Sequence, residues 1–372
     1  MKRVVSFIKS QPVLVIAFLA AAVTVFIIPP DKEYLGYCNV TVLIQLFGLM
    51  TAVAGLRSVG VFDIVTRSMM KRTGNVRRLG LALVLLCFFS SMLVTNDVAL
   101  LTFVPLTILI FKDIEDEKSR IFTIVLETAA ANLGSMLTPV GNPQNLFLYD
   151  EYSLSAGTFL ETMLPAGIVS LLCLGLLTFM LPKRSCLASA ASDAEISKVR
   201  AVVYFLLFLL CLLSVFRVVP DYVCLIGAVL AALIFDRRLL LKVDYALLAT
   251  FVCFFVFVGN IARVEQVRDF FSEILTGNEL IVSAALSQVI SNVPAAVMLS
   301  GFTENGTELL RGVNLGGLGT LIASLASLIS FQLYRKSEGA RSGRYFLVFT
   351  VVNFGMLALL MAFELTLRLI FR

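Results

Sequence analysis

Two short segments, residues 95–97 and 291–293, place polar residues of a type that binds ions inside hydrophobic segments of this chain, about half a chain apart. We call them the polar triplets. Hydroxyl and carboxamide oxygens suit a hard cation such as Na⁺, and the N–H groups at a helix N-terminus attract anions. Hydrocarbon cannot satisfy the backbone groups that such breaks release, so the breaks persist only where they line a protein-enclosed or wet cavity. Paired breaks in two halves of a chain indicate a transporter's binding site. The candidate binding residues are Thr95, Asn96 and Asp97 in the first half, and Ser291, Asn292 and Pro294 in the second.

Each triplet is followed by a second polar segment that Gly and Pro interrupt. Because so many Gly and Pro residues cannot all be helical, we expect residues 138–145 to be extended, with the side chains of Asn142, Gln144 and Asn145 exposed. In the second half, small residues at helical spacing could equally serve close helix packing. The candidate site residues are Asn132, Gly134, Thr138, Pro139, Gly141, Asn142, Pro143 and Asn145, with Asn314, Gly316, Thr320 and Ser324 in the second half.

Asp97 is the charge that we expect deepest in the membrane. A carboxylate at that depth costs about 3 kcal/mol or more unless it is paired or wet, and it marks an ion or proton pathway. We therefore expect Asp97 to be a cation ligand or a proton acceptor, with helix capping as the alternative. Its counterpart is Val293, so the two sites differ chemically. Glu127 and Glu364 lie near segment ends, where snorkelling to the interface explains them.

Composition indicates a polytopic membrane protein in a lipid bilayer, since 59% of the 372 residues are hydrophobic and only 15% are charged. Lys and Arg fall at segment ends, where they orient helices, so the net charge of +5 does not indicate nucleic-acid binding. The chain has no His, which removes the commonest proton carrier and metal ligand. We expect no cofactor and no metal other than Na⁺, bound as a coupling ion at the same polar residues.

Hydrophobic runs of about 20 residues can span the bilayer, and shorter ones can do so with snorkelling flanks. Two further stretches, 80–111 and 279–303, are apolar at both ends and polar in the middle. Each is two crossings or one re-entrant hairpin, and the short polar tip favours the hairpin. The crossing candidates are 13–28, 40–55, 121–150, 158–181, 201–217, 221–235, 244–260, 312–333 and 344–368.

The basic residues predict the orientation of the chain. Basic loops are retained on the cytoplasmic side, and here they place the N-terminus inside and the C-terminus outside. We expect the bacterial inner membrane as the location.

The odd number of crossings between the halves makes them inverted repeats. We expect an all-α polytopic membrane protein, each repeat having an amphipathic stretch (56–72 or 262–276), a re-entrant helical hairpin and a broken transmembrane helix. The expected divisions are 1–181 for the first repeat (hairpin 80–111, broken helix 121–150), 182–217 for the linker and connecting helix, and 218–372 for the second repeat (hairpin 279–303, broken helix 312–333).

With these motifs the chain resembles the ion transporter superfamily, in its citrate-transporter-like and arsenite-permease-like branch, related to the divalent anion/sodium symporters. The resemblance implies a transport domain of hairpins and broken helices, a scaffold domain that commonly forms a homodimer, and elevator-like movement. The symporters use Ser-Asn-Thr at both tips to bind sodium and substrate carboxylates. Carried over, Thr95 and Asn96 stand at one tip and Ser291 and Asn292 at the other. The third positions are Asp97 and Val293, neither of which is a Thr. An acidic residue after the first Asn is more similar to the arsenite permeases and sodium/proton antiporters.

The leading functional hypothesis is secondary transport of a small anionic solute, coupled to Na⁺ or H⁺. No Gly-rich phosphate loop is present, so drive by ATP would need a separate subunit. A cation/proton antiporter centred on Asp97 is the main alternative. An intramembrane enzyme would need an Asp/Glu or Ser/Lys pair at depth, and Asp97 has no evident second acid. A passive channel is the remaining alternative.

Overall fold

The computed structural model describes residues 11–61, 74–114, 116–185 and 197–370, and the regular structure of these residues is helical. Six of the described helices are long and apolar enough to cross a membrane, and several shorter ones are equally apolar. A helix satisfies its own backbone polar groups, which is why such a sequence folds this way in lipid. The expected all-α polytopic fold is confirmed.

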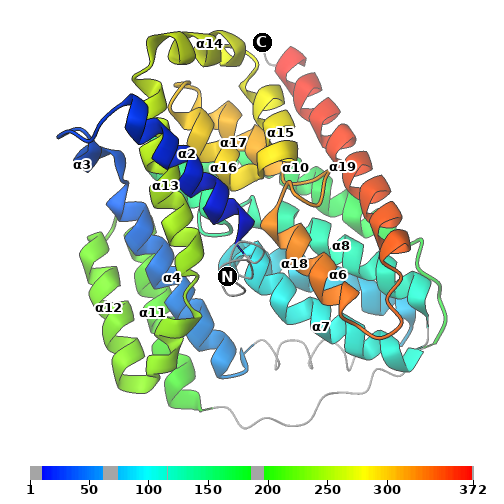
Figure 1. The fold of residues 1–372 in the computed structure, drawn as a ribbon. Helices are drawn as coiled ribbons and strands as arrows, with labels where there is room; N and C mark the ends of the chain where they lie inside the picture. Colours follow the sequence, from blue (N-terminus) through cyan, green and yellow to red (C-terminus); the bar gives the residue numbers. More distant parts are fainter. Residues whose placement is uncertain (1–10, 62–73, 115, 186–196, 371–372) are drawn as a thin grey trace, which may run out of the picture.

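The helices form two bundles that lie side by side in Figure 1. In the first, the scaffold bundle, α2 packs on α13, and α4 packs on α11 and α12. Its members are α2 (Pro12–Ile27), α3 (Tyr34–Tyr37), α4 (Val40–Ser58), α11 (Lys198–Val215), α12 (Asp221–Phe235), the 3₁₀ helix η1 (Arg237–Lys242) and α13 (Tyr245–Ala262).

The second, the broken-helix bundle, contains both polar triplets. Here α6 packs on α8, α15 on α17, α18 on α7 and α16 on α9. Its members are α6 (Val76–Val94), α7 (Asn96–Ile114), α8 (Glu117–Ser135), α9 (Pro143–Glu151), α10 (Ala156–Thr178), α15 (Glu279–Ile290), α16 (Asn292–Ser300), α17 (Gly306–Leu315), α18 (Leu325–Arg335) and α19 (Ser342–Ile370).

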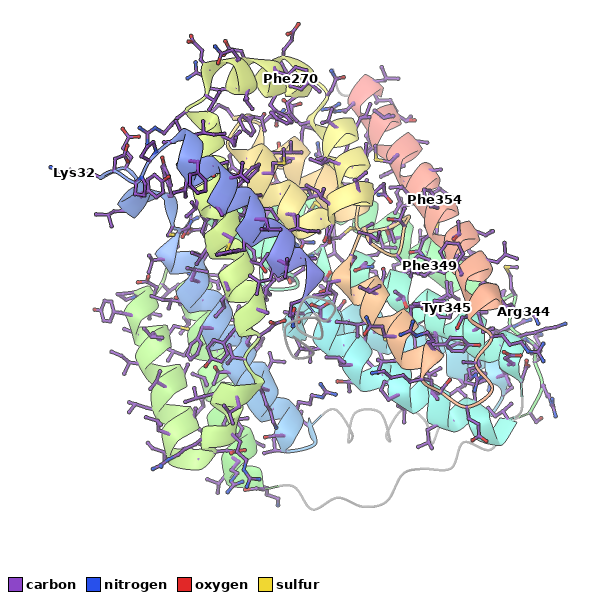
Figure 2. All side chains as sticks on the ribbon, viewed as in Figure 1. Lys32, Phe270, Arg344, Tyr345, Phe349 and Phe354 are labelled. Carbon is purple, nitrogen blue, oxygen red and sulfur yellow. The ribbon has the colours of Figure 1, made fainter. Side chains whose placement is uncertain are left out.

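The long outer helix α19 has one face buried against the bundle and one exposed face. Tyr345, Phe349 and Phe354 follow one another along it in Figure 2. Tyr345 and Phe349 are fully buried and stack on each other, whereas Phe354 is exposed. Side chains of the same apolar type thus occupy both faces, as expected for a helix with protein on one side and lipid on the other.

Both polar triplets lie at the turn between two helices that fold back on each other. The first residues of α6 pack against the last residues of α7, through contacts such as Val76 and Leu79 with Phe111. In the second pair, Thr303 after α16 donates a hydrogen bond to Glu279 at the start of α15. Both segments therefore form helical hairpins, over 76–114 and 279–300, and the first arm of the first hairpin, α6, is itself long and apolar enough to cross a membrane.

Both predicted broken helices are also present. The first is interrupted between α8 and α9, and the second between α17 and α18. The prediction of an extended run over 138–145 was wrong in its second part, because α9 begins at Pro143 and contains Gln144 and Asn145. The expected exposure of the Asn142, Gln144 and Asn145 side chains was also wrong, since all three are buried. Proline fits the first helical turn, whose N–H groups have no intrahelical partner, so Pro143 starts a helix here instead of preventing one.

One predicted amphipathic stretch is helix α14 (Glu265–Leu275), which caps the edge of the structure near the C-terminal end of α19 (Figure 1). Most of the other, 56–72, lies outside the described residues, as does most of the linker that precedes α11.

Candidate functional site

The two hairpin tips turn on a single residue with an unusual backbone. Thr95 has φ 72° and ψ 150°, and Ser291 has φ 76° and ψ 153°. This region is nearly restricted to glycine and costs about 1–3 kcal/mol for other residues, so surrounding contacts must impose it. A strained hydroxyl residue at the same point of both hairpins is a feature of a functional site.

The surrounding contacts are the same in both halves. The backbone N–H of Asn96 donates to the carbonyl of Gly141 (3.1 Å), and that of Asn292 donates to the carbonyl of Ala323 (2.9 Å). Each accepting carbonyl immediately precedes the N-cap residue of the helix that resumes, Asn142 before α9 and Ser324 before α18. The tips are thus hydrogen-bonded to the interrupted backbone.

Two threonines in the interruptions donate hydrogen bonds to backbone carbonyls that lie one turn before the tips. The hydroxyl of Thr138 donates to the carbonyl of Met92 in α6. The hydroxyl of Thr320 donates to the carbonyl of Gln288 in α15, at 2.9 Å. These bonds hold the first arm of each hairpin against the broken helix.

Asn132 links the first tip to the second interruption. Its Oδ1 accepts from Nδ2 of Asn96 (3.0 Å) and from the hydroxyl of Ser324 (2.9 Å), while its Nδ2 donates to Ser327 Oγ (3.2 Å). All these side chains are buried. The broken helices of the two halves are therefore joined by side-chain hydrogen bonds at their breaks.

Asn314 makes the reciprocal link from the second half to the first. Its Oδ1 accepts from Nδ2 of Asn142 (3.1 Å), and its Nδ2 donates to Oδ1 of Asn145 (2.6 Å). Asn145 also donates to the carbonyls of Ser135 and Thr138. A single Asn in each half thus bonds the other half's break, which gives the centre of the bundle an approximate twofold pattern.

The candidate glycines are sites of close backbone approach. A Cβ on Gly134 would lie 2.0 Å from the carbonyl oxygen of Phe88, and one on Gly141 would lie 2.1 Å from that of Ser135. A Cβ on Gly316 would lie 2.8 Å from Cα of Ala284. Gly134 and Gly316 let the hairpins approach the broken helices, and Gly141 lets the interruption fold back on the end of α8. No side chain of theirs can bind a ligand.

The candidate prolines start or interrupt helices. Pro143 is the first residue of α9, and Pro294 lies in the first turn of α16. Pro139 lies in the turn between α8 and α9.

A cavity of about 720 Å³ lies between the two bundles at the first tip. The predicted site residues Thr95, Asp97, Asn142 and Pro143 line it. Ser291 and Asn292 do not line it and are buried. Asn96 is likewise absent from the lining, because its carboxamide points to Asn132.

Charged side chains of both signs surround this cavity. Asp97 belongs to the broken-helix bundle, while Arg57, Lys242 and Asp244 belong to the scaffold bundle. Oδ1 of Asp97 is buried without a hydrogen-bond partner in the described part of the chain. Asp244 caps α13 by accepting from the N–H of Leu247 (2.9 Å). Neither Arg57 nor Lys242 forms an ion pair with another described residue.

Several helices point their N-termini at the cavity. The lining includes residues of the first turns of α7 (Asp97, Val98), α9 (Pro143, Leu146) and α18 (Leu325). A helix N-terminus carries roughly half a positive charge. Some of the first N–H groups here are already bonded within the protein, those of Asn96 and Asp97 in α7 and that of Asn145 in α9. These ends add positive potential to a cavity whose lining carries two cationic side chains, Arg57 and Lys242, and two acidic ones, Asp97 and Asp244.

Residues that the sequence did not single out take part in the site. Arg57, Lys242 and Asp244 line the cavity from a bundle far from the triplets in sequence. Gln288 donates to the carbonyls of Gly316 (2.8 Å) and Leu318 (3.0 Å) and so holds the second interruption. The only signal for Gln288 was an amide within an apolar run.

The interpretation of Glu127 and Glu364 as snorkelling residues was wrong. Glu127 is fully buried and accepts a hydrogen bond from Thr107 (2.6 Å). Glu364 is 2% exposed and lies 3.5 Å from Arg311 of α17. Both face the interior because α8 and α19 turn these faces to neighbouring helices, not to the lipid interface.

Comparison with known proteins places this architecture in a family. The family model described as a citrate transporter matches residues 4–305. The chain belongs to the citrate transporter family. An uncharacterized transporter of Methanocaldococcus jannaschii is 35% identical over 335 residues, which cover 86% of this chain and 88% of the relative. The inner membrane protein YbiR of Escherichia coli is 32% identical over 295 residues, 78% of this chain and 79% of that protein.

A solved structure gives the same overall fold. The YdaH transporter of Alcanivorax borkumensis matches with a TM-score of 0.54, at 16% identity, over 90% of this chain and 87% of that one. At this identity the match concerns the fold alone. This member of the citrate transporter family is therefore an integral membrane protein with a transporter fold.

Proposed function

We propose that the protein is a secondary active transporter that moves a small anion, a carboxylate or an oxyanion, across the membrane, coupled to a Na⁺ or H⁺ gradient. The single observation that carries the proposal is the cavity at the first tip. There the first turns of α7, α9 and α18 meet Arg57 and Lys242, neither of which has a carboxylate partner among the described residues. N–H groups at helix N-termini and unpaired cations bind anions.

Oxygen ligands for a coupling cation lie at the same place. Thr95 brings a hydroxyl, Asn142 a carboxamide, and Asp97 a carboxylate oxygen without a partner among the described residues. Na⁺ prefers such hard oxygen donors, and a proton would reside on Asp97. The cation would compensate the charge of the anion and of Asp97 during movement through the membrane.

The position of the cavity supports an elevator-like movement. One wall is α4 with the segment around Lys242, and the other is the first hairpin with α9. Sliding the broken-helix bundle along the scaffold bundle would carry the first tip away from α4. The repeated bonding at the second tip supplies an equivalent arrangement for exposure on the opposite side.

We infer that the cavity opens to the cytoplasm. Arg57 and Lys242 at its edge are exposed, and Arg237 and Arg238 are close to Lys242 in the chain. Basic residues are retained on the cytoplasmic side. On this topology α14 and the C-terminal end of α19 lie outside, and the two halves cross the membrane in opposite senses.

Transport can be tested with the purified protein in proteoliposomes. Labelled citrate, succinate, phosphate and sulfate are offered in turn under an inward Na⁺ gradient, an inward H⁺ gradient and no gradient. The proposal predicts that at least one anion accumulates above its external concentration, and that an ionophore for the coupling ion abolishes the accumulation. Absence of accumulation of all four anions under both gradients contradicts it.

A cation/proton antiporter centred on Asp97 is the second candidate, favoured by the unpartnered oxygen of that residue in the cavity. Vesicles with a trapped pH indicator distinguish the two. An antiporter alkalinises or acidifies the lumen when Na⁺ alone is added, without any anion, and Asp97→Asn abolishes the change. An anion transporter gives no such response to Na⁺ alone.

A further inference from the structure

Helix α7 has a carbonyl group that its own backbone cannot satisfy. Pro105 lies inside the helix and has no N–H group. In an α-helix, the N–H of residue 105 would bond the carbonyl of Leu101. The carbonyl of Leu101 therefore lacks its helical partner, on a residue that lines the cavity at the first tip.

Arg57 fills this position from the other bundle. Its Nη2 donates to the carbonyl oxygen of Leu101 at 2.9 Å. Arg57 lies in the last turn of α4 and itself lines the cavity. The guanidinium group is thus held at the edge of the cavity by a neutral acceptor, and it keeps its full positive charge available.

The remaining donors of Arg57 have no partner among the described residues. A guanidinium group has five N–H donors in a planar fork, and Arg57 uses one of them in a hydrogen bond to a residue of the described ranges. Asp97 and Asp244 line the same cavity, yet neither forms an ion pair with it. Such a fork matches the two oxygens of a carboxylate or an oxyanion.

We propose that Arg57 is the residue that recognises the transported anion, and that the Leu101 carbonyl freed by Pro105 positions its guanidinium group in the cavity. This rests on the function proposed above, because it assigns the anion's partner in that cavity. Pro105 is a positioning residue that acts through Leu101. Lys242 is a less suitable partner, since its flexible ammonium group has no hydrogen bond that fixes it among the described residues.

The role of Pro105 follows from helix chemistry. In Pro105→Ala the new N–H group bonds the Leu101 carbonyl within α7, which then competes with Arg57 for that acceptor. The guanidinium group is held less firmly and must be ordered when the anion binds, which weakens binding. Substitution of Pro105, which does not itself line the cavity, is therefore expected to act on anion affinity through Arg57 alone.

The test compares variants in proteoliposomes, with whichever of citrate, succinate, phosphate or sulfate the unmodified protein accumulates. Initial rates over a range of anion concentrations give KM and kcat for Arg57→Gln, Arg57→Lys, Pro105→Ala and the double variant Arg57→Gln/Pro105→Ala. The matched control is Arg77→Gln, since Arg77 also donates to a backbone carbonyl, that of Leu181 (2.8 Å), and does not line the cavity.

We expect Arg57→Gln to raise KM by roughly tenfold or more, because a charged hydrogen-bonded contact is worth about that factor or more. Arg57→Lys raises KM less, and Pro105→Ala raises it severalfold. In the Arg57→Gln background Pro105→Ala has no further effect on KM. Arg77→Gln keeps the KM of the unmodified protein.

An unchanged KM in Arg57→Gln overturns the proposal. A further rise in KM when Pro105→Ala is added to Arg57→Gln overturns the positioning role, because Pro105 would then act independently of Arg57. Failure of the proposed function is recognised separately, since the unmodified protein would then accumulate none of the four anions.

Discussion

Thr95 and Ser291 have almost the same backbone conformation, with φ of 72° and 76° and ψ of 150° and 153°. They lie at the tips of two different hairpins, and each following residue donates its N–H to the carbonyl that precedes a resumed helix. The two hairpin tips therefore share one strained backbone conformation and one type of backbone hydrogen bond to a broken helix. Their side-chain environments nevertheless differ, because only the first tip lines the cavity.

This difference predicts unequal effects of substitutions at the tips. The carboxamide of Asn96 donates to Asn132 and accepts from the N–H of Asp97 (3.0 Å). The carboxamide of Asn292 has no hydrogen bond within the described residues. Asn96→Ala should therefore destabilise the protein by about 1 kcal/mol or more, and Asn292→Ala should leave its thermal midpoint in detergent nearly unchanged. Equal midpoints for the two variants would contradict the assignment of Asn96 to the polar core.

Substitution of Asn132 should lower stability and transport more than substitution of any single residue that it contacts. Asn132→Leu leaves the side chains of Asn96 and Ser324 without their acceptor in a buried site, at a cost of about 1–3 kcal/mol for each such group. We expect a large fall in thermal midpoint and loss of transport. Thr366→Ala, which removes an exposed local bond on α19, is the control and should change neither. A stable Asn132→Leu protein with full transport would exclude the proposed link between the halves.

The close approach at Gly134 predicts a steric effect. Gly134→Ala puts a methyl group 2.0 Å from the carbonyl oxygen of Phe88, so α6 and α8 must move apart. Overpacking of this kind costs about 1–3 kcal/mol or more, and we expect little folded protein by size-exclusion chromatography. Gly175→Ala is the matched control, because nothing lies within 4 Å of its added Cβ. If both variants elute alike, the helices do not approach as described.

A buried charge network between α17 and α19 predicts a large stability effect outside the site. Arg311 lies 2.5 Å from Glu308 and 3.5 Å from Glu364, and Arg368 lies 2.6 Å from Glu308. The carboxylates of Glu308 and Glu364 are buried and the two arginines are half-buried, so Arg311→Met, which leaves Glu364 without its partner, should lower the thermal midpoint at a cost of about 1–3 kcal/mol. Arg268→Met removes only an exposed contact with Asp269 and should cost about 1 kcal/mol or less. Comparable midpoints for these two variants would show that the network does not stabilise the bundle.

The sequence predicted the elements of the site better than their connections. The hairpins and breaks were predictable because polar and helix-breaking residues inside apolar runs have few physical explanations. The hydrogen bonds of Asn132 to Ser324 and Ser327 were not predictable, since they join residues almost two hundred positions apart whose contact depends on how the halves pack.

The scaffold residues of the cavity were missed for a related reason. A basic residue at the end of a hydrophobic run, such as Arg57, ordinarily orients the helix and gives no sign of a binding role. Its importance depends on Leu101 and Pro105 of another helix, which only the hydrogen bond between Arg57 of α4 and Leu101 of α7 reveals. The extended conformation expected for 143–145 failed because Pro143 occupies the first turn of α9, where proline is favourable.

The central claim is that the two tips are exposed in turn on opposite sides of the membrane. It is tested most directly by the reactivity of Thr95→Cys and Ser291→Cys, each in a cysteine-free background, toward a membrane-impermeant maleimide added to either side of vesicles. At rest, the cavity at the first tip and the burial of Ser291, taken with the proposed orientation, predict labelling of Thr95→Cys from the cytoplasmic side and none of Ser291→Cys. With anion and coupling ion present, labelling of the first should slow while the second becomes reactive from the outside. Simultaneous reactivity of both tips, or rates that transport conditions leave unchanged, would contradict the claim.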